Sequence, residues 1–230
     1  MNGIYKNAPL IEAVFEIRFP AEISIKCKTD LFYNKLKENF PILATHPSES
    51  MHMYDFLSKE QNEIIRVGLD RISYHAKKYN GGFAKFQEDA LKYLHVFINT
   101  YNIERLTRTG LRYVNHIPIV KVDGVVPLER YLNFGYKLPS KYIPDKFELL
   151  NTILIVRIDK GKLKILLETK EMLNITKTEV LVLDFDFMFF GKLDVKNIVE
   201  YISDSHKHTK AIFEDLISDE YKKVMRGESL

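Results

Sequence analysis

Ionisable side chains recur at alternating positions in three apolar segments of the chain. The groups are Glu12, Glu16 and Arg18 in the first segment, Arg108, Arg112 and His116 in the second, and Asp184 and Asp186 in the third. Side chains separated by two or four positions lie on the same face of a β-strand, so the members of each group would share one face of their strand. These residue types are compatible with two kinds of site, one catalytic and one structural.

The catalytic interpretation joins the three groups in one polar pocket. Carboxylate oxygens are preferred ligands of Mg²⁺, guanidinium groups bind phosphate, and an imidazole such as His116 can act as a general base. Four carboxylates would hold the metal and two arginines the phosphate, namely Glu12, Glu16, Asp184, Asp186, Arg108 and Arg112. Such a set would suit a metal-dependent phosphodiesterase or a nuclease-like enzyme.

The structural interpretation pairs the same charges across the strands of an exposed sheet face. Each such pair contributes about 0.2–1 kcal/mol to stability. A variant of this interpretation buries Arg112 against Glu12 or Glu16 as an ion pair. Alternation groups residues within one strand only, so the sequence leaves open whether the three groups meet.

Asn115 interrupts an otherwise apolar strand face that also carries Leu111 and Tyr113. A buried amide must find hydrogen-bond partners, so we expect its side chain to bond a neighbouring backbone or a bulge. Proline cannot donate a ladder hydrogen bond, and Pro118 therefore predicts that this strand ends there or lies at a sheet edge. The role expected for Asn115 is structural.

Familiar catalytic motifs are missing from the sequence, which contains no GxxxxGK[ST], GxGxxG, HExxH or GxSxG pattern. The single cysteine, Cys27, excludes a zinc site built on two thiolates of this chain. His206 and His208 are two positions apart on an expected helix, which places them on roughly opposite sides. We interpret this pair as part of a solvated helix face and predict neither a cofactor nor a metal ligand set.

The elements that must position these residues follow the same order in each half of the chain. The first half is expected to form a strand, a short helix capped by Asp30, three strands and a long helix, over residues 11–19, 30–40, 53–58, 63–69, 72–78 and 83–101. The second half repeats the order over residues 104–119, 128–134, 147–158, 162–169, 179–190 and 194–225, with a loop at 135–144. A hairpin turn is expected at 159–161, with Gly161 supplying a positive φ.

This order predicts an α+β fold with a mainly antiparallel sheet and a long C-terminal helix, in one compact domain of residues 1–230. It also suggests two similar β-α-β-β-β-α halves, residues 1–102 and 103–230. The spacing of Pro20 and Pro41 equals that of Pro118 and Pro139, which favours an internal duplication. Alternating α+β chains also resemble one another without duplication, so both explanations stay open.

Composition narrows the class of protein. The 230 residues include 34 Lys and Arg against 31 Asp and Glu, a formal net charge of +3, and 46% are hydrophobic. Such values are typical of a globular chain, and so small a net charge does not indicate nucleic-acid binding. No apolar stretch approaches the ~20 residues of a membrane span, and no signal peptide is recognisable. With one cysteine, the expected location is the cytoplasm.

Three segments of the chain resemble the sequences of a known family. Residues 7–19 read NAPLIEAVFEIRF and residues 109–117 read TGLRYVNHI, while the ending carries His206, Phe213 and the ISDE run at 217–220. The chain thereby resembles, from end to end, a sporadically distributed family of uncharacterised prokaryotic proteins with an APLIEAVFEIRF-like strand and a central LRYVN-like motif. The resemblance implies a cytoplasmic prokaryotic protein and no known activity. Its matching positions are Pro9, Glu12, Glu16, Arg18, Arg112, Tyr113 and Asn115.

Three functions remain open. The leading hypothesis is a non-enzymatic binding or regulatory module that acts through a protein partner, because catalytic motifs are missing while 13 tyrosines and 15 phenylalanines can supply contact surfaces. Long helices with apolar stripes also suggest a homodimer. The alternatives are the phosphodiesterase above and a nucleic-acid-binding accessory factor. The last rests on the YHAKKY run at 74–79 and on Lys160, Lys162 and Lys164.

Overall fold

The computed structural model describes residues 5–47, 51–77, 81–133, 148–159, 161–172 and 179–228. Its strands are β1 (Leu10–Arg18), β2 (Ile42–Thr45), β3 (Tyr54–Leu57), β4 (Glu63–Gly68), β5 (Arg71–Lys77), β6 (Arg105–Pro118), β7 (Asn151–Ile158), β8 (Gly161–Glu171) and β9 (Glu179–Asp194). Its α-helices are α1 (Ser24–Cys27), α2 (Thr29–Leu36), α3 (Gly82–Tyr101), α4 (Ile198–Leu216) and α5 (Asp219–Arg226). The predicted α+β class is confirmed.

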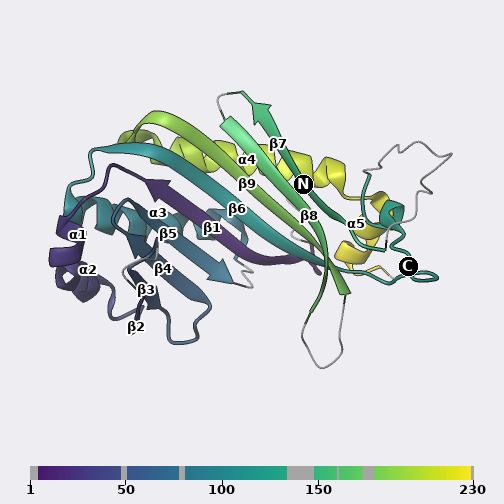
Figure 1. Cartoon of the computed structure of the whole chain (residues 1–230), viewed down its shortest axis with the longest axis horizontal. Helices are drawn as coiled ribbons and strands as arrows, with labels where there is room; N and C mark the ends of the chain where they lie inside the picture. The colour runs from purple at the N-terminus through teal and green to yellow at the C-terminus, as the bar shows by residue number, and fades with distance from the viewer. Residues whose placement is uncertain are drawn as a thin grey trace.

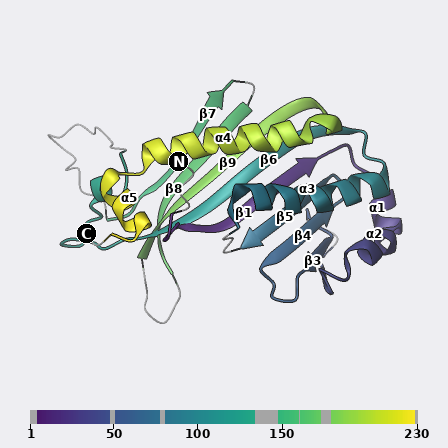
Figure 2. The same cartoon turned by 180° about the vertical axis from the view of Figure 1, so that it is seen from behind.

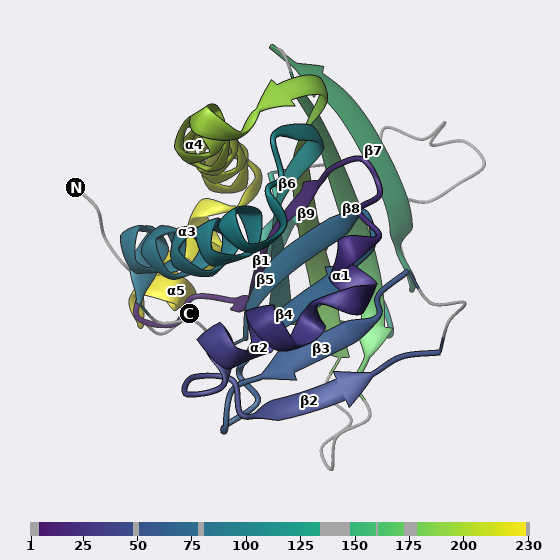
Figure 3. The ribbon, with the colours of Figure 1, turned by 90° about the vertical axis from the view of Figure 1, so that its left-hand side faces the viewer.

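All nine strands form one antiparallel sheet in the order β2-β3-β4-β5-β1-β6-β9-β8-β7. The long helices α3 and α4 lie side by side along one face of it (Figures 1 and 2). Figure 3 views the molecule from the side and shows the helices gathered on that face. We call this the helix face and the opposite side of the sheet the open face.

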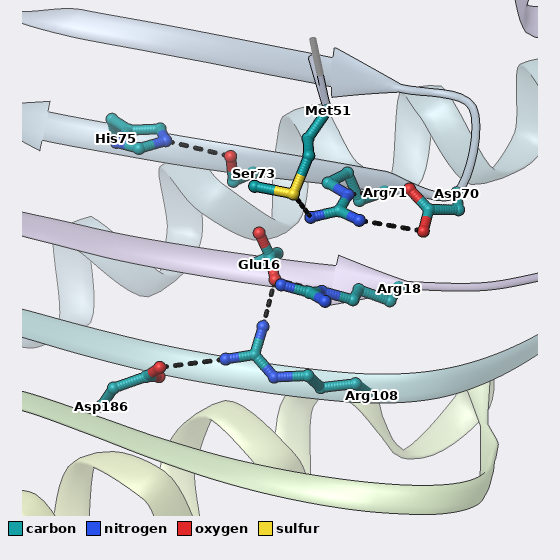
Figure 4. Close-up of polar contacts among 9 residues, drawn as sticks. All are labelled: Glu16, Arg18, Met51, Asp70, Arg71, Ser73, His75, Arg108 and Asp186. Carbon is teal, nitrogen blue, oxygen red and sulfur yellow. Dashed lines mark hydrogen bonds and ion pairs between the residues drawn. The ribbon is translucent and has the colours of Figure 1, made fainter. Parts of the chain in front are cut away.

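Strand alternation builds the core between the sheet and the helices. In β1, for example, Ala13, Phe15 and Ile17 are fully buried on the helix face, while Glu16 points to the open face (Figure 4) and Glu12, which bonds His75, shares that face. One cluster of buried side chains joins the first half to α3, and a second joins β8 and β9 to α4 and α5. The sheet itself runs through both halves, because β1 pairs with β6.

The strand order is symmetric about the pairing of β1 with β6. On one side the order is β1, β5, β4, β3, with β2 as an additional edge strand, and on the other it is β6, β9, β8, β7. Each half therefore places its first strand centrally, its last strand beside it and its long helix on the helix face. This symmetry is one of topology, and the internal duplication stays a prediction.

Several predicted boundaries differ from the structure. The short strand β2 escaped prediction because its side chains are mostly exposed and show no buried alternation. Helix α2 begins at Thr29 after Lys28, without a side-chain cap, so Asp30 lies in the first turn and is not the N-cap. Only a 3₁₀ turn, Leu128–Arg130, forms after Pro127, and the expected loop at 135–144 lies outside the described residues.

The expected single C-terminal helix is divided. Strand β9 continues to Asp194, a 3₁₀ turn (Val195–Asn197) precedes α4, and Ile217 then leaves the helical conformation with ψ of 132°. The hydroxyl of Ser218 accepts a hydrogen bond from the Tyr221 backbone N–H and so caps α5. In the described part of the chain, no helix is both long and apolar enough to cross a membrane.

The turn between β7 and β8 also departs from expectation. Asp159 adopts the left-handed conformation, with φ of 48°, and Gly161 is the first residue of β8. A Cβ on Gly161 would lie 2.5 Å from the ring of Phe187. Close packing against Phe187 therefore explains why this position is glycine.

Candidate functional site

The charged residues singled out in the sequence meet on the open face, in the middle of the sheet. Strand β1 supplies Glu12, Glu16 and Arg18, and its neighbour β6 supplies Arg108, Arg112 and His116. On the far side of β6, strand β9 supplies Asp184 and Asp186. We call the charged side chains on β5, β1, β6 and β9 of this face the charged ladder.

Ion pairs link the ladder across β1, β6 and β9. Arg112 binds Asp184 with both arms, from Nε to Oδ1 at 2.8 Å and from Nη2 to Oδ2 at 2.6 Å. Arg108 lies between two carboxylates, contacting Glu16 on one side and Asp186 on the other, where Nη2 and Oδ2 are 3.0 Å apart (Figure 4). Arg18 also donates from Nε to Glu16, at 2.7 Å.

The ladder extends into β5 through residues that sequence reasoning missed. His75 Nδ1 lies 3.0 Å from Glu12 Oε1, and His75 Nε2 lies 2.9 Å from the Ser73 hydroxyl. Arg71 donates to Asp70 at 2.7 and 3.0 Å and contacts the sulfur of Met51 at 3.5 Å (Figure 4). Arg71, Ser73 and His75 alternate along β5, so the rule that found the other groups would have found these as well.

Burial and pairing shift the titration of the ladder. The hydrogen bond from His75 lowers the pKa of Glu12. Burial raises the pKa of Asp186, although the positive charges of Arg108 and Arg112 oppose this shift. The hydrogen bonds to Asp184 raise the pKa of Arg112. The charges are thus held by one another in a partly desolvated layer.

This geometry supports the structural interpretation of the charges. The carboxylates pair with cations, and among the described residues no group of three or more His, Cys, Asp or Glu side chains could hold a metal ion. The two arginines expected to bind phosphate are already engaged by Glu16, Asp184 and Asp186. Cross-strand charge pairing is confirmed. The predicted ion pair of Arg112 with Glu12 or Glu16 is wrong, because Arg112 pairs with Asp184.

His116 and Asn115 lie at the end of β6 near Pro118. His116 faces Val182 in the register of β6 and β9, and burial lowers its pKa. Asn115 is on the helix face, 4% exposed, and donates from Nδ2 to the carbonyl of Leu183 at 3.1 Å. The predicted bond from this amide to a neighbouring backbone is confirmed, as is the end of the strand at Pro118.

Two members of the basic and aromatic run at 74–79, Tyr74 and His75, are buried and are not exposed for stacking on bases. Tyr74 is fully buried on the helix face, where its ring packs against Phe86 and Tyr93. His75 is also buried, on the open face, and is bound as described above. Lys78, Tyr79 and Lys160 lie outside the described residues.

The two histidines of α4 pack against aromatic rings, so the predicted solvated helix face is wrong. His206 stacks on Phe83 with ring centroids 3.7 Å apart, and its Nδ1 lies 2.9 Å from the Tyr113 hydroxyl. His208 stacks on Phe187 at 5.2 Å. Both contacts arise because α4 crosses β6 and β9 next to α3, an arrangement that helical spacing alone does not reveal.

Beside His206 lies a cavity that no sequence pattern predicted. Its volume is about 480 Å³, it is open to solvent on one side, and it is lined by α3, α4, the sheet and the chain segment that leads into β1. The segment is held there by hydrogen bonds from the Asn7 backbone N–H to the Met225 carbonyl and from the His116 N–H to the Pro9 carbonyl. Residues from all parts of the chain meet here, which is why no local signal marks the site.

Comparison of the chain with protein-family models and with curated proteins finds no match. The resemblance carried by residues 7–19 and 109–117 therefore stays a prediction.

Proposed function

We propose that the protein is a binding module that acts through a protein partner, and that the partner adds an extended segment to the outer edge of β7. The observation that carries the proposal is the character of this edge strand. Its eight residues pair with β8 on one side only, and in the described part of the chain no strand pairs with the other side. An unpaired edge presents backbone N–H and C=O groups that can bind another strand.

The side chains of β7 favour such pairing. Ile155 is 67% exposed, and Ile153 and Val156 are exposed as well, so three β-branched apolar side chains face solvent on one short strand. The opposite edge of the sheet differs, because β2 has only four residues and follows Pro41. Short strands and prolines are the usual protection of a sheet edge, and β7 has neither.

Charge identifies the chemistry of the partner. Arg157 of β7 and its neighbours Lys162 and Lys164 of β8 lie on the open face beside this edge. Ile153 and Ile155 share the open face with these cations, so a partner strand that carries both apolar and acidic side chains on its open face would cover the isoleucines and meet the cations. A second copy of the chain would bring the same basic face to the edge, so we favour a different protein over a homodimer.

Matched substitutions test the proposal. Ile155→Glu places a carboxylate at an exposed position opposite Lys164, so it should leave the fold intact and repel an acidic partner strand. Ile23→Glu is the control, because Ile23 is equally exposed, at 68%, but lies beside α1. Tagged protein is isolated from host lysate, and β7 amide exchange is then measured with and without the recovered partner.

The expected result is a stoichiometric partner that binds wild type and Ile23→Glu, protects β7 amides from exchange and is lost from Ile155→Glu. Binding that Ile155→Glu leaves unchanged would refute the proposed edge. Light scattering that shows a dimer for the 27.0 kDa chain, abolished by Ile155→Glu, would instead assign the edge to a second copy.

A further inference from the structure

The cavity beside His206 has aromatic walls. Phe83 and Phe86 reach it from α3, Phe185 from β9 and Phe213 from α4. The His206 ring, stacked on Phe83 with an interplanar angle of 4°, continues this lining. A volume of about 480 Å³ lies within the range of small-molecule sites, which are mostly apolar with a few placed polar groups.

Polar groups stand at the sheet side of the cavity. Asn115 lines it, and after Nδ2 has bonded Leu183 the amide Oδ1 has no hydrogen-bond partner among the described residues. The Tyr113 hydroxyl and His206 Nδ1 satisfy each other. Burial lowers the pKa of His206 to about 4, so at neutral pH the ring adds no charge to the cavity. The interior is therefore uncharged, with the amide oxygen of Asn115 and the buried, unpartnered hydroxyl of Thr209 able to accept a hydrogen bond.

Charge appears only toward solvent. The exposed residues Lys6 and Lys210 line the cavity, and Lys210 is close enough for its charge to act on His206. The acidic residue nearby, Glu214, accepts a hydrogen bond of 2.6 Å from the Tyr5 hydroxyl. Two lysines against one carboxylate leave the solvent side of the cavity positive.

From this arrangement we infer that the cavity binds a flat aromatic molecule with one anionic group, its rings lying between the phenylalanines and its anion beside Lys210. Aromatic walls favour an aromatic body, because rings gain from stacked and edge-to-face contacts as well as from burial. A hydrogen-bond donor on the ligand would meet Oδ1 of Asn115. The inference is independent of the β7 edge, since the cavity lies on the helix face.

The probe is 8-anilinonaphthalene-1-sulfonate, a fluorescent aromatic anion, titrated into the full chain. N-phenyl-1-naphthylamine, which lacks the sulfonate, serves as its neutral counterpart. Lys210→Glu reverses the charge beside the cavity, and Lys207→Glu is the control, because Lys207 lies on the same helix, is exposed and does not line the cavity. Neither substitution disturbs a buried contact, so both variants should fold as wild type does, which circular dichroism checks.

We expect saturable binding of about one sulfonate dye per chain, weakened about threefold to tenfold by Lys210→Glu and unchanged by Lys207→Glu. The neutral dye should not distinguish the variants. As competitors, 2-naphthoate should displace the dye at lower concentration than decanoate does. Non-saturable binding, equal binding to both lysine variants, or stronger displacement by decanoate would overturn the inference, the last in favour of an aliphatic acid.

Discussion

Replacing Arg108 by methionine tests whether the charged ladder contributes to stability. Its guanidinium lies between Glu16 and Asp186, and the three side chains are only 13%, 17% and 22% exposed. Methionine keeps the length and apolar stem of the side chain but removes the charge. After the substitution Glu16 keeps its ion pair with Arg18, whereas Asp186 loses its ion pair with Arg108.

The size of the effect follows from burial. Removing one partner of a fully buried ion pair costs about 3–5 kcal/mol. The ladder is only partly buried and Glu16 keeps Arg18, so we expect Arg108→Met to lower the free energy of unfolding by about 2 kcal/mol at neutral pH. Arg105→Met is the control, because Arg105 lies on the same strand but is exposed, and its effect should stay within about 0.5 kcal/mol.

The loss should also depend on pH in a defined direction. Burial already raises the pKa of Asp186 in the folded state, so ionisation of this carboxyl opposes folding as pH rises through that value. Without Arg108 the pKa of Asp186 rises further, and the penalty of the substitution grows with pH and shrinks on acidification. Urea unfolding followed by circular dichroism at about pH 7 and pH 4.5 measures both effects. A loss below about 0.5 kcal/mol at pH 7, or one that grows in acid, would refute the reasoning.

Three further substitutions follow from single contacts. Because its pKa is lowered, Glu12 stabilises the fold above the unfolded value of about 4.3, and this contribution disappears as pH falls through the folded pKa; Glu12→Gln should therefore flatten the acid limb of a stability profile measured by urea unfolding. The Thr209 hydroxyl is buried without a hydrogen-bond partner, so Thr209→Val should raise stability by about 1 kcal/mol, seen as a higher Tm. Gly161→Ala would push a Cβ against Phe187 and should cost about 1–3 kcal/mol in the same thermal assay, and an unchanged Tm would contradict that packing.

Strands that bury one face, such as β1, were the most predictable elements, whereas the mostly exposed β2 escaped prediction. The alternation of Ala13, Phe15 and Ile17 with polar residues predicts β1 without reference to the rest of the chain, and β6 and β9 follow the same rule. The order of strands has no such local signal. The strand order depends on which apolar strand faces pack against α3 and α4. The residues of a single strand do not indicate which strand lies next to it.

The ion pairs within the charged ladder were also only partly predictable from the sequence. Alternation correctly places Arg112 and Asp184 on one face of their strands, but Arg112 lies directly opposite Asp186 in the register and still bonds Asp184. The choice is made by side-chain length and sheet geometry, which only the structure provides. The histidines of α4 escaped prediction for a related reason, since the burial of His206 depends on Phe83, more than a hundred residues earlier in the chain.

The pairing of the charges within the ladder also indicates where on the protein a ligand or a partner binds. A site that binds a charged ligand must keep some charges unpaired, whereas Arg108 and Arg112 both form ion pairs with carboxylates of their own sheet. A phosphate or a metal ion could bind here only by breaking these ion pairs. That would leave partly buried charges without their partners, which is unfavourable. Among the described residues, unmet hydrogen-bonding capacity includes the outer edge of β7 and, in the cavity, Oδ1 of Asn115 and the hydroxyl of Thr209. The paired charges therefore hold the central strands together, and we expect binding at the outer edge of β7 and in the cavity beside His206.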